Sequence, residues 1–512
     1  MRKPLLSLAV VAIVASGCTA ATTSTSGPYV APPPEHHDQA PPVQAAPPVQ
    51  EVPVGTPYDG VTFQNPGVNA FVDPQKDNQS TFGLDVDTAS YTVARRFVTD
   101  GNLPDPASVR VEEFVNYFDQ GYAPPEQGDF AIHVDGGPSP FLDESEVLLR
   151  VGLKARDDSS HARPDAALTF VIDVSGSMAR ENRLELVKRS LRLLVEGLRR
   201  NDSVGIVVYG TQARVVLKPT NANDSEAILA AIDSLQPEGS TNAEAGLRLG
   251  YEMARAQLRE EGINRVILAS DGVANVGATD ADTILARVRD DAKDGIQLVT
   301  VGFGMGNFND VLLEKLADTG DGFYAYVDDI DEARRLFVED LTGTLESVAL
   351  DARVQVEFDP AAVAAYRLIG FENRAIDDEA FRDPNVKAGA IGAGHSSTAL
   401  YAVRLTGETT PKAKIGTISL RWVEPVTNRP RELARDVRPT DIAASFRATS
   451  PTLKLDALVS AAAERFRGSS YGSSYILRDV VREAYGVSED LPQSDEVHGF
   501  LDLLNKAAAL ER

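Results

Sequence analysis

One stretch of the chain, LTFVIDVSGSMAR at residues 168–180, restricts the possible folds more than any other. The largely apolar run Leu168 to Ile172 is typical of a buried strand, and it leads directly into Asp173-Val174-Ser175-Gly176-Ser177. An amphipathic helix pattern follows from Arg183. A buried strand that passes through a short turn into a helix indicates an α/β sheet. The carboxylate and two hydroxyls at the end of the strand are oxygen ligands of the kind that hard metal ions prefer.

The alternation of apolar strands with amphipathic helices continues as far as Ser347. It predicts a doubly wound, mostly parallel α/β sheet with a Rossmann-like arrangement over residues 165–347. In such sheets, ligands bind where loops leave the carboxyl ends of the strands. The expected strands are 203–209, 213–217 at an edge, 264–269, 296–303 and 323–327, and the expected helices are 183–200, 225–235, 243–260, 280–290, 309–316 and 330–345.

Two further segments of this domain carry matching oxygen ligands. Thr241 lies in the loop Gly239-Ser240-Thr241-Asn242, and Asp271 follows the expected strand 264–269. Three hydroxyls and two carboxylates would suit Mg²⁺, which takes oxygen ligands and retains waters, and they would also suit Mn²⁺. The alternative is that Asp173 caps a helix and that the serines are ordinary turn residues. That alternative does not explain why the remaining ligands follow in order on separate loops.

The order Asp-x-Ser-x-Ser, then Thr, then Asp resembles the metal-ion-dependent adhesion site, or MIDAS, of von Willebrand factor type A (VWA) domains. The resemblance implies a metal site that is made by Asp173, Ser175, Ser177, Thr241 and Asp271. It also implies that an Asp or Glu of a protein or peptide partner fills one coordination position. The flanking segments resemble the YfbK-like group of bacterial VWA lipoproteins over nearly the whole mature chain.

The N-terminus has the features of a secretory signal. A basic start precedes the apolar stretch Leu5 to Val14, which is too short to span a bilayer, and Ala15-Ser16-Gly17 precede the only cysteine of the chain, Cys18. This arrangement resembles a bacterial lipobox and implies that residues 1–18 form a lipoprotein signal peptide with acylation at Cys18. The alternative is a plain secretory signal. Acylation at Cys18 implies a lipid-anchored cell-envelope protein. Thr19 rather than aspartate follows Cys18, which resembles outer-membrane sorting in enteric-type bacteria, so we expect the protein at the outer membrane facing the periplasm, or at the cell surface.

Residues 19–57 are rich in proline, alanine and glutamine, and we expect them to form a disordered tether. At about 3.1 Å per residue in polyproline II, such a tether reaches roughly 100 Å. His36-His37 within it are interpreted as solvated rather than metal-binding. The formal net charge of −25 argues against nucleic acid as a partner, since binding phosphates requires a basic surface.

Both flanks of the α/β domain are expected to be folded. Residues 58–160 predict a small mixed domain, in which Asp85 and Asp87 lie on a solvated strand face. Residues 348–512 predict a β-rich region followed by helices, with a loop over 376–395. Strands expected at 130–134, 146–154, 352–358, 399–405 and 414–422 suggest one antiparallel sandwich that the α/β domain interrupts, and helices are expected at 90–100, 106–118, 454–467, 476–485 and 498–510.

No catalytic constellation is evident in the sequence, which lacks a P-loop, an HExxH motif and a GxSxG elbow. The histidines are scattered, and His395 in GAGHSS is interpreted as a loop residue rather than as the base of a nearby serine. Gly302 to Gly306 has GxGxG spacing and is interpreted as a turn rather than a dinucleotide site. We therefore expect a binding protein and not an enzyme. The rival hypotheses are a metal-dependent envelope hydrolase and a structural envelope protein whose metal only stabilises the fold.

Overall fold

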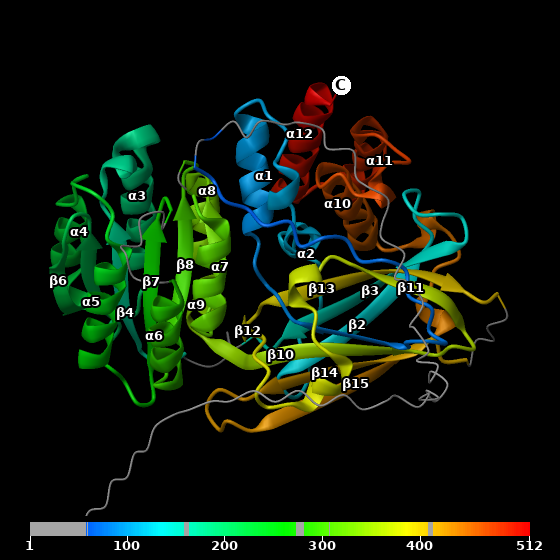
Figure 1. Cartoon of the computed structure of the whole chain (residues 1–512), viewed down its shortest axis with the longest axis horizontal. Coiled ribbons are helices and arrows are strands. Elements are labelled where there is room, and N and C mark those ends of the chain that lie inside the picture. The colour runs from blue at the N-terminus through cyan, green and yellow to red at the C-terminus, as the bar shows by residue number, and fades with distance from the viewer. Residues whose placement is uncertain are drawn as a thin grey trace, which may run out of the picture. The chain divides into compact units, whose positions relative to one another are not determined.

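The computed structural model describes residues 58, 60–157, 163–272, 281–306, 308–407 and 413–511. The expectations for the signal peptide, for Cys18 and for the proline-rich segment lie outside these residues. The described chain forms three β-sheets and a group of helices (Figure 1). Among the described helices, none has the length and apolar character needed to cross a bilayer.

The six-stranded sheet has the order β6-β5-β4-β7-β8-β9. All of its neighbouring strands are parallel except β5 and β6, so the expectation of a doubly wound, mostly parallel sheet is confirmed. From β4 the chain moves to β5 on one side and later to β7 on the other, which places a topological switch point beside β4. The strands are β4 (Ala166–Asp173), β5 (Ser203–Tyr209), β6 (Ala213–Asn221), β7 (Ile263–Ser270), β8 (Gln297–Phe303) and β9 (Tyr324–Val327).

Helices cover both faces of this sheet, and alternate residues of β4 point to opposite sides. Phe170 and Ile172 pack in one apolar core with residues of α3 and α4, whereas Val171 packs in the other core with residues of α5, α6 and α7. The helices are α3 (Arg183–Gly197), α4 (Ser225–Asp233), α5 (Ala243–Ala256), α6 (Ala281–Lys293), α7 (Asp310–Thr319), α8 (Ile330–Arg334) and α9 (Leu341–Leu345).

The closing helix expected over 330–345 is not continuous. A π-helical turn, η5 (Arg335–Glu339), separates α8 from α9, and Asp340 leaves helical geometry with φ −95° and ψ 13°. The chain then packs closely against the neighbouring sandwich, where a Cβ on Gly343 would lie 2.3 Å from Nε2 of His395. The sequence pattern of residues 330–345 does not predict the break, because His395, which Gly343 contacts, lies outside that segment.

The remaining strands form the two antiparallel sheets of a sandwich. One sheet has the order β1-β10-β14-β15, with β12 beside β10, and the other has the order β11-β13-β3-β2. The expectation that strands from both sides of the α/β domain share a sandwich is therefore confirmed, since β1 pairs with β10 and β3 pairs with β13. The strands are β1 (Gln79–Gly83), β2 (Phe130–Gly137), β3 (Glu146–Ala155), β10 (Ser347–Phe358), β11 (Val363–Ile369), β12 (Gly389–Gly392), β13 (Ser396–Leu405), β14 (Gly416–Val423) and β15 (Pro430–Val437).

Three of these strands were not expected from the sequence. Strand β12 lies within the segment 376–395, which was interpreted as loop, and β11 and β15 had no assignment. The sequence of β15, PRELARDV, is polar and mostly exposed, and it lies at the edge of its sheet. Its backbone nevertheless pairs with β14 along its full length. A strand that is held mainly by backbone pairing leaves little hydrophobic alternation in the sequence.

A group of helices packs on the outer face of the sheet that contains β13 and β3. Helix α1 lies between the six-stranded sheet and α12 and contacts both (Figure 1). Val93 and Phe97 join the core on the α5 side of that sheet, whereas Tyr91 and Val98 join the helical core. The helices are α1 (Ala89–Thr99), α2 (Val111–Asn116), α10 (Pro451–Phe466), α11 (Leu477–Asp490) and α12 (Asp495–Leu510).

The helix expected over 106–118 is divided in two. A short 3₁₀ turn, η1 (Pro106–Ser108), precedes α2, because Val109 and Arg110 are extended. The guanidinium of Arg110 bonds to Asp310 at 2.6 Å, which ties this break to the helix α7.

Asp85 and Asp87 do not lie on a solvated strand face, so that expectation was wrong. Their exposed fractions are 4% and 3%, and the guanidinium of Arg374 lies 3.1 Å from Asp85 and 3.4 Å from Asp87. Asp87 also accepts a hydrogen bond from the backbone amide of Tyr324 in β9. Buried carboxylates require such partners, and Arg374 is 289 residues away from Asp85 in the sequence.

Candidate metal centre

Two carboxylates meet at the carboxyl edge of the six-stranded sheet. Asp173 is the last residue of β4, and Asp271 follows the last residue of β7. These strands are parallel neighbours with Ile172 opposite Ala269, so their ends lie side by side. The order of the strands therefore brings together side chains that are 98 positions apart by their residue numbers, 173 and 271.

The turn after β4 is organised by its own polar side chains. Asp173 accepts hydrogen bonds from the backbone amide of Ser175 at 2.8 Å and from the hydroxyl of Ser270 at 3.0 Å. The hydroxyls of Ser175 and Ser177 lie 3.0 Å apart, and Ser177 donates to Oδ1 of Asp271 at 3.0 Å. Four of the five predicted ligands thus form one hydrogen-bonded group.

The fifth predicted ligand, Thr241, lies in a loop that contacts this turn. The backbone amide of Gly176 donates to the carbonyl of Gly239 at 3.1 Å. Gly239 has φ +71°, and a Cβ there would lie 2.1 Å from the hydroxyl of Thr211, so this position requires glycine. Asn242 caps α5 immediately after Thr241. The half-buried Thr241 hydroxyl makes no hydrogen bond to any residue in the described ranges, which leaves it available as a ligand.

Burial makes both carboxylates costly to ionise in the absence of a cation. It raises the pKa of Asp173 to about 6, and the nearby charge of Asp271 acts in the same direction. Burial also raises the pKa of Asp271, although Arg183 opposes that change. A divalent cation would compensate these charges, and the hydroxyl-rich donor set fits Mg²⁺ or Mn²⁺. Within the described residues no group of three or more His, Cys, Asp or Glu could hold a metal, so the hydroxyls are essential to this prediction.

Arg183 also lies at this candidate site, although it is not part of the sequence motif. Its Nη1 donates to Oδ2 of Asp271 at 2.8 Å, and its Nη2 donates to the carbonyl of Met305. Arg183 is the first residue of α3, where a cation is unfavourable beside the positive end of the helix dipole. A basic residue at this position is a signal in the sequence that a specific acidic partner lies nearby.

The glycine-rich segment after β8 is a turn, as expected. Gly304 has φ +78°, and a Cβ there would lie 2.4 Å from Nε of Arg183. Gly304 and Gly306 therefore allow the backbone to pass close to the Arg183 side chain. Gly302 lies within β8, where a Cβ would meet the rings of Phe308 and Tyr326. These close contacts account for the three glycines without a dinucleotide.

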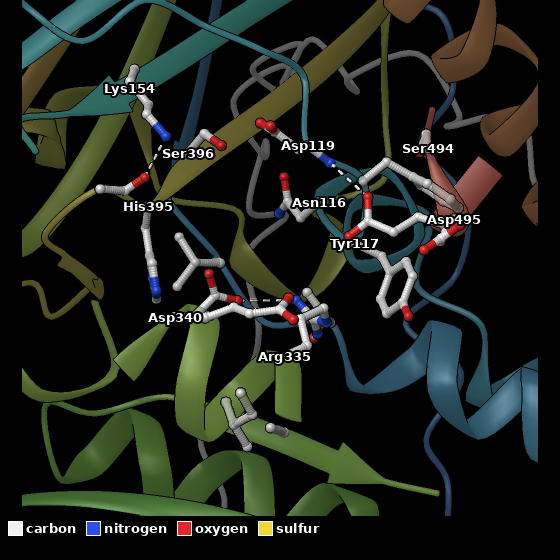
Figure 2. Close-up of a pocket in the computed structure, with 18 of the residues that line it drawn as sticks. Asn116, Tyr117, Asp119, Lys154, Arg335, Asp340, His395, Ser396, Ser494 and Asp495 are labelled. Carbon is white, nitrogen blue, oxygen red and sulfur yellow. Dashed lines mark hydrogen bonds and ion pairs between the residues drawn. The ribbon is translucent and has the colours of Figure 1, made fainter. Parts of the chain in front are cut away.

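A cavity of about 800 Å³ lies away from the metal centre, among α2, η5, the β12–β13 turn and the α11–α12 loop. Figure 2 shows His395 in this cavity together with Lys154, Asp340 and Ser396. Among the described residues, no hydrogen bond joins the His395 ring to Ser396 or to Asp340, and burial lowers the pKa of His395. A serine nucleophile needs a base within hydrogen-bond reach, and His395 and Ser396 do not form such a pair in the described part of the chain.

The sequence matches three family models. Residues 58–150 match the model described as von Willebrand factor, residues 167–340 match the von Willebrand factor type A domain, and residues 343–510 match the C-terminal model of uncharacterized protein YfbK. The uncharacterized protein YfbK of Escherichia coli (strain K12) is 36% identical over 434 residues, which cover 81% of this chain and 75% of the relative. The chain belongs to the YfbK-like family of VWA-domain proteins.

Two other proteins that are similar to this chain are more distant from it. The uncharacterized protein sll0103 of Synechocystis is 30% identical over 219 residues, which cover 43% of this chain and 51% of the relative. The solved structure of a von Willebrand factor type A protein from Catenulispora acidiphila has 17% identity and a TM-score of 0.43, and it covers 73% of this chain and 89% of that one. VWA domains commonly bind a divalent metal at a MIDAS, and membership in this group suggests a role in protein–protein interaction or adhesion.

Proposed function

We propose that this protein is a lipid-anchored component of the cell envelope whose VWA domain binds a protein partner through a divalent cation. The cation, Mg²⁺ or Mn²⁺, is held by Asp173, Ser175, Ser177, Thr241 and Asp271. A carboxylate from an Asp or Glu of the partner completes its coordination. When bound, the cation supplies the electrophilic centre to which that carboxylate attaches.

The observation that carries this proposal is the hydrogen-bonded group at the ends of β4 and β7. It combines the buried carboxylates of Asp173 and Asp271 with the hydroxyls of Ser175 and Ser177, and the Thr241 loop contacts the same turn. Two carboxylates are few charged ligands for a divalent cation. A cation in such a site keeps part of its charge and favours an additional anionic ligand. The other residues of the group orient the donors: Asp173 fixes the turn through the Ser175 amide, and Asp271 orients the Ser177 hydroxyl.

A metal-dependent pull-down from envelope extract tests the function. The wild-type chain is compared with Asp173→Ala in the presence of Mg²⁺ and in the presence of EDTA. Asp165→Ala is the matched control, since Asp165 lies just before the opposite end of β4. Its side chain makes a partly exposed ion pair with Arg259 at 3.7 Å. We expect a partner to be retained by the wild type and by Asp165→Ala with Mg²⁺, and lost with EDTA or with Asp173→Ala.

Two results would contradict the proposal. Partner binding that persists in EDTA would indicate that the metal only stabilises the fold. Hydrolysis of a substrate panel by the purified protein, abolished by Asp173→Ala, would indicate a metal-dependent hydrolase instead.

The lipid anchor is tested separately. We expect the wild-type chain to fractionate with envelope membranes and to carry a lipid-modified Cys18 by mass spectrometry. We expect Cys18→Ser to appear in the soluble fraction. A soluble wild-type protein without the modification would show that the segment is a plain secretory signal.

A further inference from the structure

Both carboxylate oxygens of Asp271 already have partners in the protein. Ser177 donates to Oδ1 at 3.0 Å, and Arg183 donates to Oδ2 at 2.8 Å. The Asp271 and Arg183 side chains are only 3% and 4% exposed, so water screens this ion pair weakly. We propose that Arg183 keeps Asp271 from coordinating the cation directly and so lowers the affinity of the site for metal alone. This inference rests on the metal site of the proposed function.

The Arg183 side chain is held in place from several directions. Its second terminal nitrogen donates to the carbonyl of Met305, and the absence of a Cβ on Gly304 makes room for its stem. Glu181 lies 3.5 Å from the guanidinium, and Arg96 of helix α1 holds Glu181 at 3.0 Å. Because these contacts hold the guanidinium in place, the ion pair between Arg183 and Asp271 persists when a cation binds.

The backbone before α3 supports this arrangement. Glu181 and Asn182 both have positive φ values, 51° and 58°, which are unfavourable for residues other than glycine. Two consecutive residues in this conformation persist only where surrounding contacts stabilise them. Here the contacts are the ion pairs that Glu181 makes with Arg96 and Arg183.

The consequence for metal binding follows from the charge of the ligands. With Asp271 paired to Arg183, Asp173 is the only carboxylate in the site that is not engaged by a cationic side chain. Affinity for a hard divalent cation depends on the number of charged ligands, so the site binds the cation weakly by itself. A carboxylate from a partner then adds the missing charge, and metal and partner bind cooperatively.

Titration of the purified full chain with Mg²⁺ alone, followed by calorimetry, tests this inference. We expect Arg183→Met to bind Mg²⁺ at least about tenfold more tightly than the wild type, because Asp271 is freed to coordinate it. Arg183→Lys keeps a positive charge beside Asp271, and we expect its Mg²⁺ affinity to stay within about threefold of the wild type. Equal or weaker binding by a folded Arg183→Met variant would overturn the inference.

A second variant covers the case in which Arg183→Met does not fold. Glu181 is 47% exposed, and Glu181→Gln removes the counter-charge of Arg183 without opening the core. We expect Mg²⁺ to bind this variant about two- to threefold more weakly, the modest size that is usual for a partly exposed ion pair. Unchanged or tighter binding by Glu181→Gln would refute the role given to Arg183.

These titrations need no partner, so they are independent of the pull-down. If Arg183→Met gains affinity while Asp173→Ala still captures the partner, the inference holds and the proposed function fails. If neither the wild type nor a folded Arg183→Met variant binds Mg²⁺, the inference fails, whereas the pull-down with Mg²⁺ and with EDTA still decides the proposed function.

Discussion

Glu112 on helix α2 provides a sensitive test of how this fold tolerates buried charge. Its side chain is 1% exposed, and neither of its carboxylate oxygens has a hydrogen-bond partner of good geometry among the described residues. Burial, aided by the nearby charge of Glu372, raises the pKa of Glu112 to about 7 from an ordinary value of 4.5. The folded chain therefore keeps this proton over a pH range in which the unfolded chain has released it.

The sign and size of the effect follow from this difference in pKa. Because the folded state binds the proton more tightly, the stabilisation is fully present below about pH 4.5 and is lost as the pH rises through about 7. The loss amounts to about 3 kcal/mol, at 1.36 kcal/mol for each pK unit. We expect Glu112→Gln to remove this dependence, and to be about 3 kcal/mol more stable than the wild type at pH 8 and about equal to it at pH 4.

The single tryptophan of the chain makes the measurement direct. Trp422 is buried in the sandwich on which α2 packs, so its fluorescence reports unfolding of that part in urea. Glu489→Gln, at an exposed position on α11, is the matched control and should not alter the pH dependence. A stability difference between Glu112→Gln and the wild type that is no larger at pH 8 than at pH 4 would refute the reasoning.

Three further predictions test other parts of the structure. Gly304→Ala should lower the free energy of unfolding by about 1–3 kcal/mol, because an alanine would have to adopt φ +78° and its Cβ would lie 2.4 Å from Nε of Arg183. A thermal melt that matches the wild type would contradict this prediction. Asp456→Ala should destabilise the protein by about 1–3 kcal/mol in urea, because the 5%-exposed side chain of Arg150 loses its partner at 2.8 Å but keeps Asp135 at 2.7 Å, whereas Asp456→Asn should cost less. Phe170→Ala, at a fully buried position in β4, should cost about 3–5 kcal/mol, and a loss below about 1 kcal/mol would show that the core around β4 can collapse to fill the cavity.

The sequence predicted most of the α/β domain because each of its elements has a strong local signal. Buried parallel strands such as β4 and β7 are nearly continuous apolar runs, and the helices between them have clear amphipathic periodicity. The DxSxS turn lies at the end of one such run, so its place at the carboxyl edge of the sheet follows from the alternation of strand and helix. The ligand set itself remains a prediction.

Other features had no local signal. The polar edge strand β15 is held by backbone pairing, and the closing helix changes to a π turn where the sandwich contacts Gly343. The burial of Asp85 and Asp87 depends on Arg374, which no pattern near them indicates. Each of these features depends on a partner that is distant in the sequence.

The sequence alone therefore determined the class of the sheet, the position of the DxSxS turn and the oxygen-bearing side chains of that turn, because local hydrophobic period and residue type are sufficient for these. Only the tertiary structure showed that Ser177 bonds to Asp271 and that Arg183 occupies the other oxygen of that carboxylate. Only the tertiary structure showed that Glu181 pairs both with Arg183 and with Arg96 of α1. The reason is physical: pairwise electrostatics depends on distance in space, and the order of strands in the sheet sets those distances.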